Sequence, residues 1–337
     1  MSSYAPALPE LRAAIDAALV TFLAERRAAL PEAAPMLDEI DRLLAAGGKR
    51  LRPAFCYWGF RAGGGAHSDA AVAAAASLEL LHTFAIVHDD IMDESDERRG
   101  EPAVHVRCGV PIALLVGDLA LVLADALFAQ AGFSAEDARR GFAPYSVMRQ
   151  EVIAGQALDV LAARRELVDE AEARRIAVLK SGRYSIEKPL VIGASLAGAR
   201  TASIQALSAF GEPLGEAFQL RDDLLGTFGD PAVTGKPADG DIREGKRHVL
   251  FAHAAARAQG DDRDFLLSRW GGRDAITADD VARLRRILED HGARAATEAL
   301  LDRRVADAGR ALAALDVDGD SAAALADLAR EATDRRL

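Results

Sequence analysis

The feature that most constrains the fold is a long apolar stretch that ends in a cluster of acids. The segment AAVAAAASLELLHTFAIVHDDIMDE is apolar on almost every side until Asp89, and it is rich in Ala and Leu, which are strong helix formers. A helix that is apolar all round has to be surrounded by other helices. Because no run of alternating β-branched residues argues for a sheet, we predict an all-α fold built as one large bundle.

The charge and cysteine content of the chain exclude several functional classes. With 337 residues, half of them hydrophobic, the chain is long enough for a sizeable core,. Its net charge of −11 lacks the basic excess of a nucleic-acid-binding protein, so we expect no nucleic-acid partner,. Cys56 and Cys108 are the only cysteines, too few for a disulfide framework, so we expect a reducing compartment,.

The apolar segments predict a cytoplasmic protein without a transmembrane segment. The N-terminal MSSYAPALPE has no basic region followed by an apolar core, so we expect no signal peptide,. The most hydrophobic segment, VPIALLVGDLALVLADALFA, contains Asp118 and Asp125. Two acids in the middle are unfavourable in a membrane span, and we interpret the helix around Gly117–Phe128 as interior core or as a dimer interface.

Helical periodicity continues along the chain and predicts one domain over residues 1–337. Leu11, Ile15 and Leu19 share one face of a helix that we expect to end near Pro31,. The longest break, GDPAVTGKPADGDIREGKR over Gly229–Arg247, is rich in Gly, Pro and charge. Long loops inside compact domains are usually functional or disordered, so we expect this break to be an unpacked loop.

The strongest chemical signal is the sequence HDDIMDESDERRG at the end of the apolar helix. Asp89 and Asp93 stand at i and i+4 and therefore share a face, with Asp90 alongside,. Three carboxylates this close repel one another unless cations neutralise them, and magnesium prefers carboxylate oxygens together with water and substrate phosphates. The alternative is an acidic, solvated helix end, which the burial of the rest of the helix makes less favourable.

A second acidic cluster follows another apolar helical run in FQLRDDLLGTFGD. Asp222 and Asp223 stand far along the chain from Asp89, so each cluster is expected to end a different core helix. If those helices face each other, their carboxylates can hold several magnesium ions. A single Asp pair is a weak signal, whereas two pairs on apolar helices of one bundle are a strong one.

With these motifs the chain resembles the trans-prenyl diphosphate synthases, or polyprenyl synthetases, and most of all the geranylgeranyl diphosphate synthases. The resemblance covers about residues 37–250 and its motifs come in the family's order: GGKRLRP, ELLHT, DDIMD followed by RRG, GQALD, LKSG, FQLRDD and a loop with two lysines. It implies a single polyprenyl synthetase domain with the isoprenoid synthase type of helical bundle and a deep central cavity. It also implies a homodimer.

The resemblance also implies a role for each matched residue. The residues that would bind magnesium are Asp89, Asp90, Asp93 and Asp222, with Asp223 supporting the waters of the metal. Those that would bind isopentenyl diphosphate are Lys49, Arg52, His82 and Arg99. Those that would bind the allylic diphosphate and its departing charge are Arg98, Lys180, Ser181, Lys236 and Lys246. Those that would line the same polar mouth are Gln156, Asp159 and Gln219.

The side-chain chemistry agrees with these implied roles. Arg presents a planar fork to phosphate oxygens and Lys a compact charge, although such residues also serve simply as solvated surface. His82 lies on an apolar helix, where a hydrogen-bonded core histidine is an alternative reading. The implied cofactor is Mg²⁺, three ions per site with substrate bound and replaceable by Mn²⁺. The catalytic set would be Asp89, Asp90, Asp93, Asp222, Asp223, Lys180 and Arg98.

The implied reaction is the head-to-tail condensation of isopentenyl diphosphate with an allylic diphosphate through an allylic cation. The product would grow beneath the first Asp motif, where Leu81, Phe84 and Ala85 form the floor. A single aromatic at Phe84 followed by the small Ala85 resembles the twenty-carbon, geranylgeranyl type of enzyme. A farnesyl or a longer-chain synthase is the alternative. Phe84 could also be an ordinary core residue, and this role is compatible with one in setting the product length.

One residue departs from the family pattern. The fuller form of the second motif has Asp at its fifth position, where this chain has Gly226. We expect a weakened or water-mediated magnesium contact there, with Asp230 as a candidate substitute. Gly226 keeps a non-catalytic paralogue subunit open as an alternative. A terpene cyclase is disfavoured because the chain has two Asp motifs and the basic GGKRLRP segment.

Overall fold

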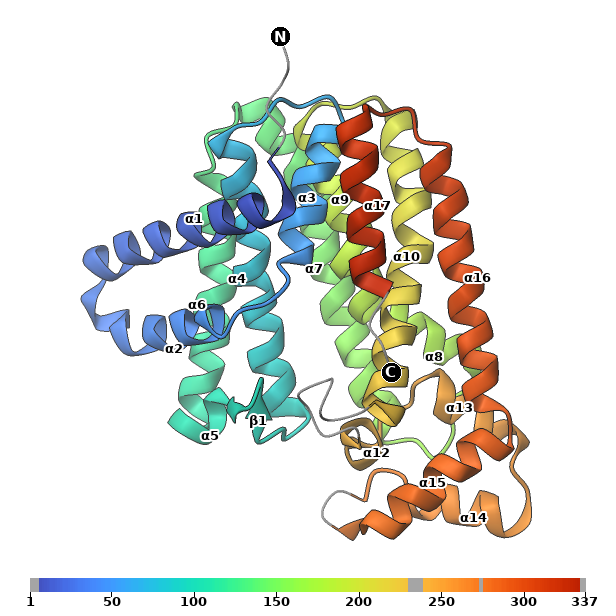
Figure 1. Ribbon diagram of the computed structural model, residues 1–337. Coiled ribbons are helices and arrows are strands. Elements are labelled where there is room, and N and C mark those ends of the chain that lie inside the picture. The colour runs from blue at the N-terminus through green and yellow to red at the C-terminus, as the bar shows by residue number, and fades with distance from the viewer. Residues whose placement is uncertain (1–5, 230–238, 273–274, 334–337) are drawn as a thin grey trace. The chain divides into compact units, whose positions relative to one another are not determined.

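The computed structural model describes residues 6–229, 239–272 and 275–333, and almost every regular element in these ranges is a helix (Figure 1). The helices of the N-terminal half are α1 (Leu8–Ala29), η1 (Pro31–Ala33), α2 (Ala34–Ala45), α3 (Leu51–Ala62), α4 (Asp69–Met92), α5 (Val104–Cys108), α6 (Val110–Ala129) and α7 (Ala135–Ala163). Those that follow are α8 (Glu170–Ala177), η2 (Val178–Glu187), α9 (Lys188–Leu196), α10 (Thr201–Phe228), α12 (Gly240–Glu244), α13 (Val249–Arg257), α14 (Gly260–Arg269), α15 (Ala278–Asp290), α16 (Ala293–Ala313) and α17 (Gly319–Thr333). The predicted all-α class is confirmed.

The chain forms two compact units, which are described separately. Unit 1 comprises the described parts of Met1–Val147, Lys188–Ser208 and Ala314–Leu328. Unit 2 comprises those of Met148–Glu187, Ala209–Ala313 and Ala329–Leu337. Helices α7, α10 and α17 contribute residues to both units. The prediction of one domain over the whole chain stays a prediction.

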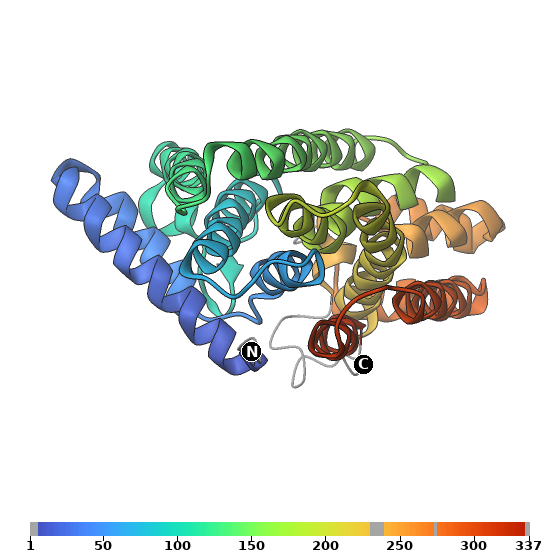
Figure 2. The same cartoon turned by 90° about the horizontal axis from the view of Figure 1, so that it is seen from above.

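Helix α4 is the centre of unit 1. It packs against α1, α2, α3, α5, α6 and α9. Seen from above in Figure 2, the dark-blue α1 lies along one side of α3 and α4. The Ser68 hydroxyl accepts a hydrogen bond from the Ala71 N–H and caps the start of α4, as N-cap residues commonly do,. Leu78, Leu80 and Leu81 are completely buried. The apolar segment is therefore a surrounded core helix, as its composition predicts.

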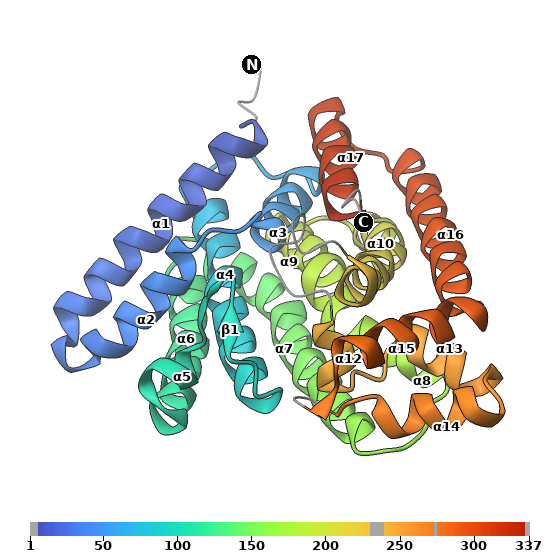
Figure 3. The same cartoon turned by 60° about the horizontal axis from the view of Figure 1, so that its bottom comes forward.

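Helix α13 takes the central place in unit 2. It packs against α8, α14, α15 and α16, and each residue from Val249 to Ala255 is buried. Figure 3 shows these helices and α12 gathered together. Because α13 follows directly on the long Gly- and Pro-rich break, its burial fixes the end of that segment.

Two short elements differ from the predictions. The Gly229–Arg247 break contains the helix α12, whose Ile242 is completely buried, so its described part is not simply an unpacked loop. Gly245 ends α12 with φ 76°, a left-handed conformation that glycine adopts without strain,. A two-residue antiparallel ribbon, β1 (Glu97–Arg98) with β2 (Glu101–Pro102), follows α4, although the sequence pattern gave no sign of a sheet.

By length and composition, two helices of the described ranges, α4 and α6, could each cross a membrane. The apolar window of α4 is 72% buried inside the protein, which is the character of a core helix. That of α6 is only 44% buried. The large apolar residues that α6 exposes are Val110, Ile112, Leu114, Leu115 and Val122.

Candidate active site

The first Asp motif forms the C-terminal turn of α4 in unit 1. The Asp93 N–H donates to the Asp89 carbonyl oxygen at 2.8 Å, so the last helical turn carries both residues on one face,. Both side chains are half-buried. Carboxylates at a helix C-terminus face the negative end of the helix dipole, so this cluster requires nearby positive charge.

Arg98 supplies positive charge to the buried member of the motif. Its Nε lies 2.9 Å from Oδ1 and 3.2 Å from Oδ2 of Asp90, and its Nη2 also donates to Oδ1. Asp90 is only 2% exposed, and this burial raises the pKa of its carboxyl above the ordinary value, while Arg98 acts in the opposite direction. Asp90 and Arg98, the predicted metal and diphosphate residues, therefore contact each other. Asp89 and Asp93 are the less buried pair.

Four arginines gather beside the first motif. Burial holds the pKa of His82 well below the usual value, and the charges of Arg52, Arg99, Arg98 and Arg50 lower it further. His82 is therefore a neutral hydrogen-bonding group in a strongly positive surrounding. The predicted diphosphate residues Arg52, His82, Arg98 and Arg99 are thus brought together, and Lys49 is an exposed neighbour of this group in sequence.

Two arginines, Arg50 and Arg99, hold the basic loop in place. Arg50 has φ 49°, a left-handed conformation that is uncommon outside glycine, and donates from Nη1 to Glu79 at 2.9 Å and from Nε to Asp16 at 2.8 Å,. Arg99 also has a positive φ, 57°, and its Nη1 donates to the carbonyl oxygens of Leu43 and Gly47. Strained backbone of this kind is typical of functional sites.

The predicted chain-length residues lie one to two turns before Asp89 on α4. Leu81 is completely buried and Phe84 is 9% exposed, whereas Ala85 is half-buried. The Phe84 ring meets the His88 ring edge to face at 4.9 Å. His88 lies over Gly117 of α6 so closely that a side chain at Gly117 would overlap it. This packing fixes the position of Phe84.

The second Asp motif lies in unit 2 near the end of α10. Asp222 is exposed, whereas Asp223 is only 4% exposed. Gln219 donates to Asp223 Oδ1 at 2.7 Å, while Oδ2 is buried and has no hydrogen-bond partner. Burial raises the pKa of the Asp223 carboxyl well above its ordinary value, and the charges of Asp241, Asp222 and Asp159 act in the same direction.

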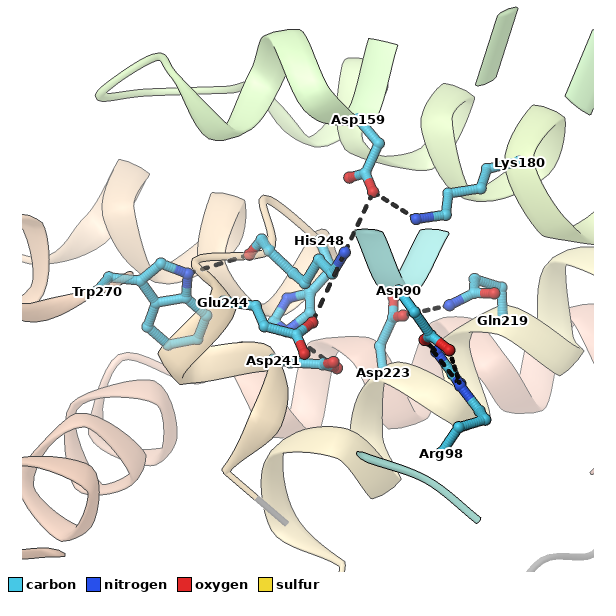
Figure 4. A network of polar contacts seen from close by, with 11 residues as sticks. Asp90, Arg98, Asp159, Lys180, Gln219, Asp223, Asp241, Glu244, His248 and Trp270 are labelled. Carbon is cyan, nitrogen blue, oxygen red and sulfur yellow. Dashed lines mark hydrogen bonds and ion pairs between the residues drawn. The ribbon is translucent and has the colours of Figure 1, made fainter. Parts of the chain in front are cut away.

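Two lysines of unit 2 pair with one carboxylate of α7, and Figure 4 shows one of them, Lys180, beside this acid, Asp159. Lys180 Nζ lies 2.6 Å and Lys246 Nζ 3.6 Å from Asp159 Oδ2. Lys246 also lies 3.7 Å from Glu244, and its carbonyl oxygen accepts a hydrogen bond from Trp270 Nε1 at 3.1 Å. The two ammonium groups are therefore held next to each other by a shared acid.

The position of Lys180 depends on unusually close helix packing. Lys180 lies in η2, a π-helical segment, and such segments are frequent at functional sites,. A Cβ on Gly155 of α7 would lie 2.7 Å from Lys180 Cα, and one on Gly182 would lie 2.8 Å from the Gly215 carbonyl carbon of α10. Glycine at these positions lets the helix backbones touch. Ser181 and Gln156 lie half-buried in the same two segments.

The donor chemistry of both motifs fits magnesium. Within the described ranges, no three Asp, Glu, His or Cys side chains gather closely enough to hold an ion by themselves. Magnesium needs no such cage, because it binds through one or two carboxylates and completes its shell with water and phosphate. The unpaired buried Oδ2 of Asp223 is an acceptor that requires a donor such as the water of a bound ion,.

Comparison with known proteins identifies the family. Residues 34–288 match the family model of polyprenyl synthetase. The chain belongs to the polyprenyl synthetase family. It is 39% identical over 255 residues to a geranylfarnesyl diphosphate synthase of Aeropyrum pernix, covering 74% of this chain and 78% of that one. It is 38% identical over 249 residues to a geranylgeranyl diphosphate synthase of Sulfolobus acidocaldarius, covering 72% and 73%.

A solved structure supports the same assignment. The geranylgeranyl pyrophosphate synthase of Corynebacterium glutamicum, complexed with isoprenyl diphosphate and magnesium, matches with a TM-score of 0.93 and 33% identity, covering 98% of this chain and 100% of that one. The predicted isoprenoid synthase type of helical bundle and the predicted trans-prenyl diphosphate synthase activity are confirmed. Polyprenyl synthetases are magnesium-dependent and use isopentenyl and allylic diphosphates.

Sequence reasoning missed several residues of this polyprenyl synthetase. Glu79 binds Arg50, and a lone acid inside the apolar α4 could have indicated such a buried pair. Asp241 and His248, which flank Lys246, were passed over because the segment was interpreted as an unpacked loop. Lys236 and Asp230, two residues of the predicted site, lie outside the described residues.

Proposed function

We propose that this polyprenyl synthetase extends allylic diphosphates with isopentenyl diphosphate and stops at geranylgeranyl diphosphate. The observation that carries the chain length is the single aromatic Phe84, fixed against His88 one turn before the first Asp motif and followed by the small Ala85. A product that lengthens beneath Asp89 would meet the Phe84 ring. The two relatives described above make products of different length, so relatedness alone does not decide it.

The arginine cluster of unit 1 suits the diphosphate of isopentenyl diphosphate, which is not cleaved in the reaction. Arg52 and Arg99 would bind the phosphate oxygens of isopentenyl diphosphate, with Lys49 adding a flexible charge. His82, whose pKa is lowered mainly by burial and further by its positive neighbours, would donate one hydrogen bond without adding charge. Arg98 would act mainly through Asp90, holding the end of α4 in position for Asp89 and Asp93.

The lysines of unit 2 suit the diphosphate of the allylic substrate, which is the leaving group. Lys180 and Lys246 would move from their shared partner Asp159 to the allylic diphosphate, as its C1–O bond breaks and the electron pair leaves with oxygen,. Ser181, Gln156 and Gln219 would complete the polar surface. Lys236, which lies outside the described residues, is proposed to bind the same diphosphate. The double bond of isopentenyl diphosphate then attacks the allylic C1, and a proton passes to the departed diphosphate, so charge and atoms balance.

Asp89, Asp90 and Asp93 of α4 and Asp222 of α10 would hold the magnesium ions, with Asp223 binding their waters. We propose three ions with substrate bound, replaceable by Mn²⁺. When bound, magnesium supplies positive charge that stabilises the departing diphosphate. Both Asp motifs would thereby serve one reaction.

We also propose that the enzyme is a cytoplasmic homodimer. The apolar side chains that α6 exposes in unit 1, among them Leu115 and Val122, need a cover,. A second copy of the chain is the natural partner, because apolar helix faces of this kind are typical of obligate interfaces. Light scattering of the wild type and of a Leu115→Asp, Val122→Asp variant tests this. A dimer that becomes monomeric supports it, and a monomeric wild type contradicts it.

A product assay tests the proposed function. The purified protein is incubated with radiolabelled isopentenyl diphosphate, magnesium and dimethylallyl, geranyl or farnesyl diphosphate in turn, and the dephosphorylated alcohols are sized. We expect a mainly twenty-carbon alcohol that is lost with chelator and on Asp89→Ala. Another length would contradict only the role of Phe84, whereas no elongation with any primer would favour a non-catalytic subunit.

A further inference from the structure

The ribbon that carries Arg98 and Arg99 has little internal support. Each of its strands, β1 and β2, has only two residues, and an isolated two-stranded ribbon is marginally stable at best. Arg99 and Gly100 form the turn with φ 57° and 76°, and such left-handed backbone costs free energy at a residue other than glycine. The position of the two arginines therefore depends on contacts outside the ribbon.

Helix α2 supplies such contacts through the buried acid Glu39, which is 7% exposed. Its Oε2 accepts a hydrogen bond from Arg42 Nε at 2.9 Å, and its Oε1 accepts one from Arg107 Nε at 3.1 Å. Arg42 also donates from Nη2 to the Pro102 carbonyl oxygen at the end of β2, at 3.3 Å. Arg107 belongs to α5, which follows the ribbon (Figure 1). The Glu39 carboxylate thus ties the ribbon and the helix after it to α2.

The contacts of Arg99 lie further along the same helix. Arg99 Nη1 donates to the carbonyl oxygens of Leu43 and Gly47, and Leu43 stands one turn after Glu39 on α2,. Arg52, whose charge acts on Arg99, follows on the next helix, α3. Releasing the contacts of Glu39 would therefore let the ribbon tilt about Arg99. The spacing between Arg99 and Arg52 would then change.

We propose that Glu39 is a positioning residue for isopentenyl diphosphate. The proposal rests on the proposed function and deepens it, because Arg52 and Arg99 are the proposed ligands of that diphosphate. Glu39 acts through Arg42 and Arg107 and does not touch the substrate itself. It holds the two phosphate-binding arginines at the spacing that the diphosphate requires.

The effect of losing Glu39 should fall on one of the two substrates. Arg98 lies on the same ribbon, but its hydrogen bonds to Asp90 anchor it to the end of α4. The lysines proposed for the allylic diphosphate, Lys180 and Lys246, belong to unit 2. Loss of Glu39 should therefore weaken the binding of isopentenyl diphosphate and leave that of the allylic diphosphate nearly unchanged.

Two measurements on the full chain test the proposal: calorimetric binding of isopentenyl diphosphate without an allylic substrate, and steady-state kinetics with each substrate varied in turn. Glu39→Gln keeps the size of the side chain and removes its charge. We expect Kd and KM for isopentenyl diphosphate to rise about 10-fold, the loss of roughly one arginine–phosphate hydrogen bond. The kcat and the KM for the allylic diphosphate should stay close to the wild-type values.

Arg107→Gln changes the other side of the same contact at an exposed position. It should also weaken the binding of isopentenyl diphosphate. The double variant Glu39→Gln, Arg107→Gln should be no worse than Glu39→Gln alone, because both changes remove the same contact.

Glu216→Gln is the matched control. Glu216 of unit 2 is 5% exposed and lies 2.6 Å from Arg174 Nε and 2.7 Å from Arg304 Nε, so it is also a buried acid between two arginines. Its replacement should lower the free energy of unfolding in the same way as Glu39→Gln, without weakening the binding of isopentenyl diphosphate.

Wild-type affinity for isopentenyl diphosphate in Glu39→Gln overturns the proposal, as does an equal loss of affinity in Glu216→Gln. If Glu39→Gln does not fold, an unchanged affinity in Arg107→Gln overturns it. A wild type that neither binds isopentenyl diphosphate nor elongates any primer would contradict the proposed function instead. The two failures are therefore distinguishable.

Discussion

Substituting Gly155 by alanine should disable the enzyme by moving Lys180. The new Cβ would lie 2.7 Å from Lys180 Cα and 2.8 Å from the Leu179 carbonyl carbon, whereas ordinary contacts begin at 3.4 Å. The neighbouring atoms belong to the backbone, so the η2 segment has to retreat by roughly 1 Å to regain normal packing. Overpacking of this kind costs about 1–3 kcal/mol of stability, and a displacement of ~1 Å at a catalytic group costs roughly 100-fold in rate.

Gly309→Ala is the matched control for this substitution. Gly309 is also helical, lies exposed on α16 and has no atom within 4 Å of an added Cβ. Replacing it should stabilise the fold by about 0.5–1 kcal/mol, the ordinary gain for this exchange in a helix. Urea unfolding gives the free energies, and steady-state kinetics with varied allylic diphosphate give kcat and KM. A Gly155→Ala enzyme with wild-type stability and kcat would refute the reasoning.

Three further outcomes follow from burial. Burial lowers the pKa of His248 from 6.5 to about 4, so between these values only the unfolded chain binds the proton. The free energy of unfolding should therefore fall by up to about 3 kcal/mol from pH 6.5 to pH 4. In urea unfolding, a His248→Asn variant should lose this part of the pH dependence. An unchanged pH dependence in the variant would contradict the role of His248. Burial raises the pKa of the Cys56 thiol to about 12, so Ellman's reagent at pH 8 should modify Cys108 in the native protein and Cys56 only after unfolding; native reactivity of Cys56 would show that its surroundings open. Phe84→Ala should release the floor and yield alcohols longer than twenty carbons by mass spectrometry, whereas an unchanged product length would place the floor elsewhere.

The sequence alone was sufficient for features that depend on local pattern. The apolar composition of residues 70–88 requires a surrounded helix, and α4 is one. The four-residue spacing of Asp89 and Asp93 places both on one face of the last turn.

Features that depend on tertiary packing were beyond the reach of the sequence. Nothing local indicates that Lys180 and Lys246, on separate segments, share Asp159. The π-helical form of η2 and its close contact with Gly155 are seen only in the assembled unit. The close approach of Asp241 to Gly226 could not be predicted, because the positions of α10 and α12 relative to each other are set by their common core.

The central claim is that both Asp motifs serve one reaction, and a double-mutant cycle tests it most directly. kcat/KM for the allylic diphosphate is measured for the wild type, Asp89→Ala, Asp222→Ala and the double variant at saturating magnesium. Residues that act as a unit are strongly non-additive, so the double variant should be little worse than the poorer single variant. Losses that simply multiply would show that the two motifs act independently and would contradict the claim.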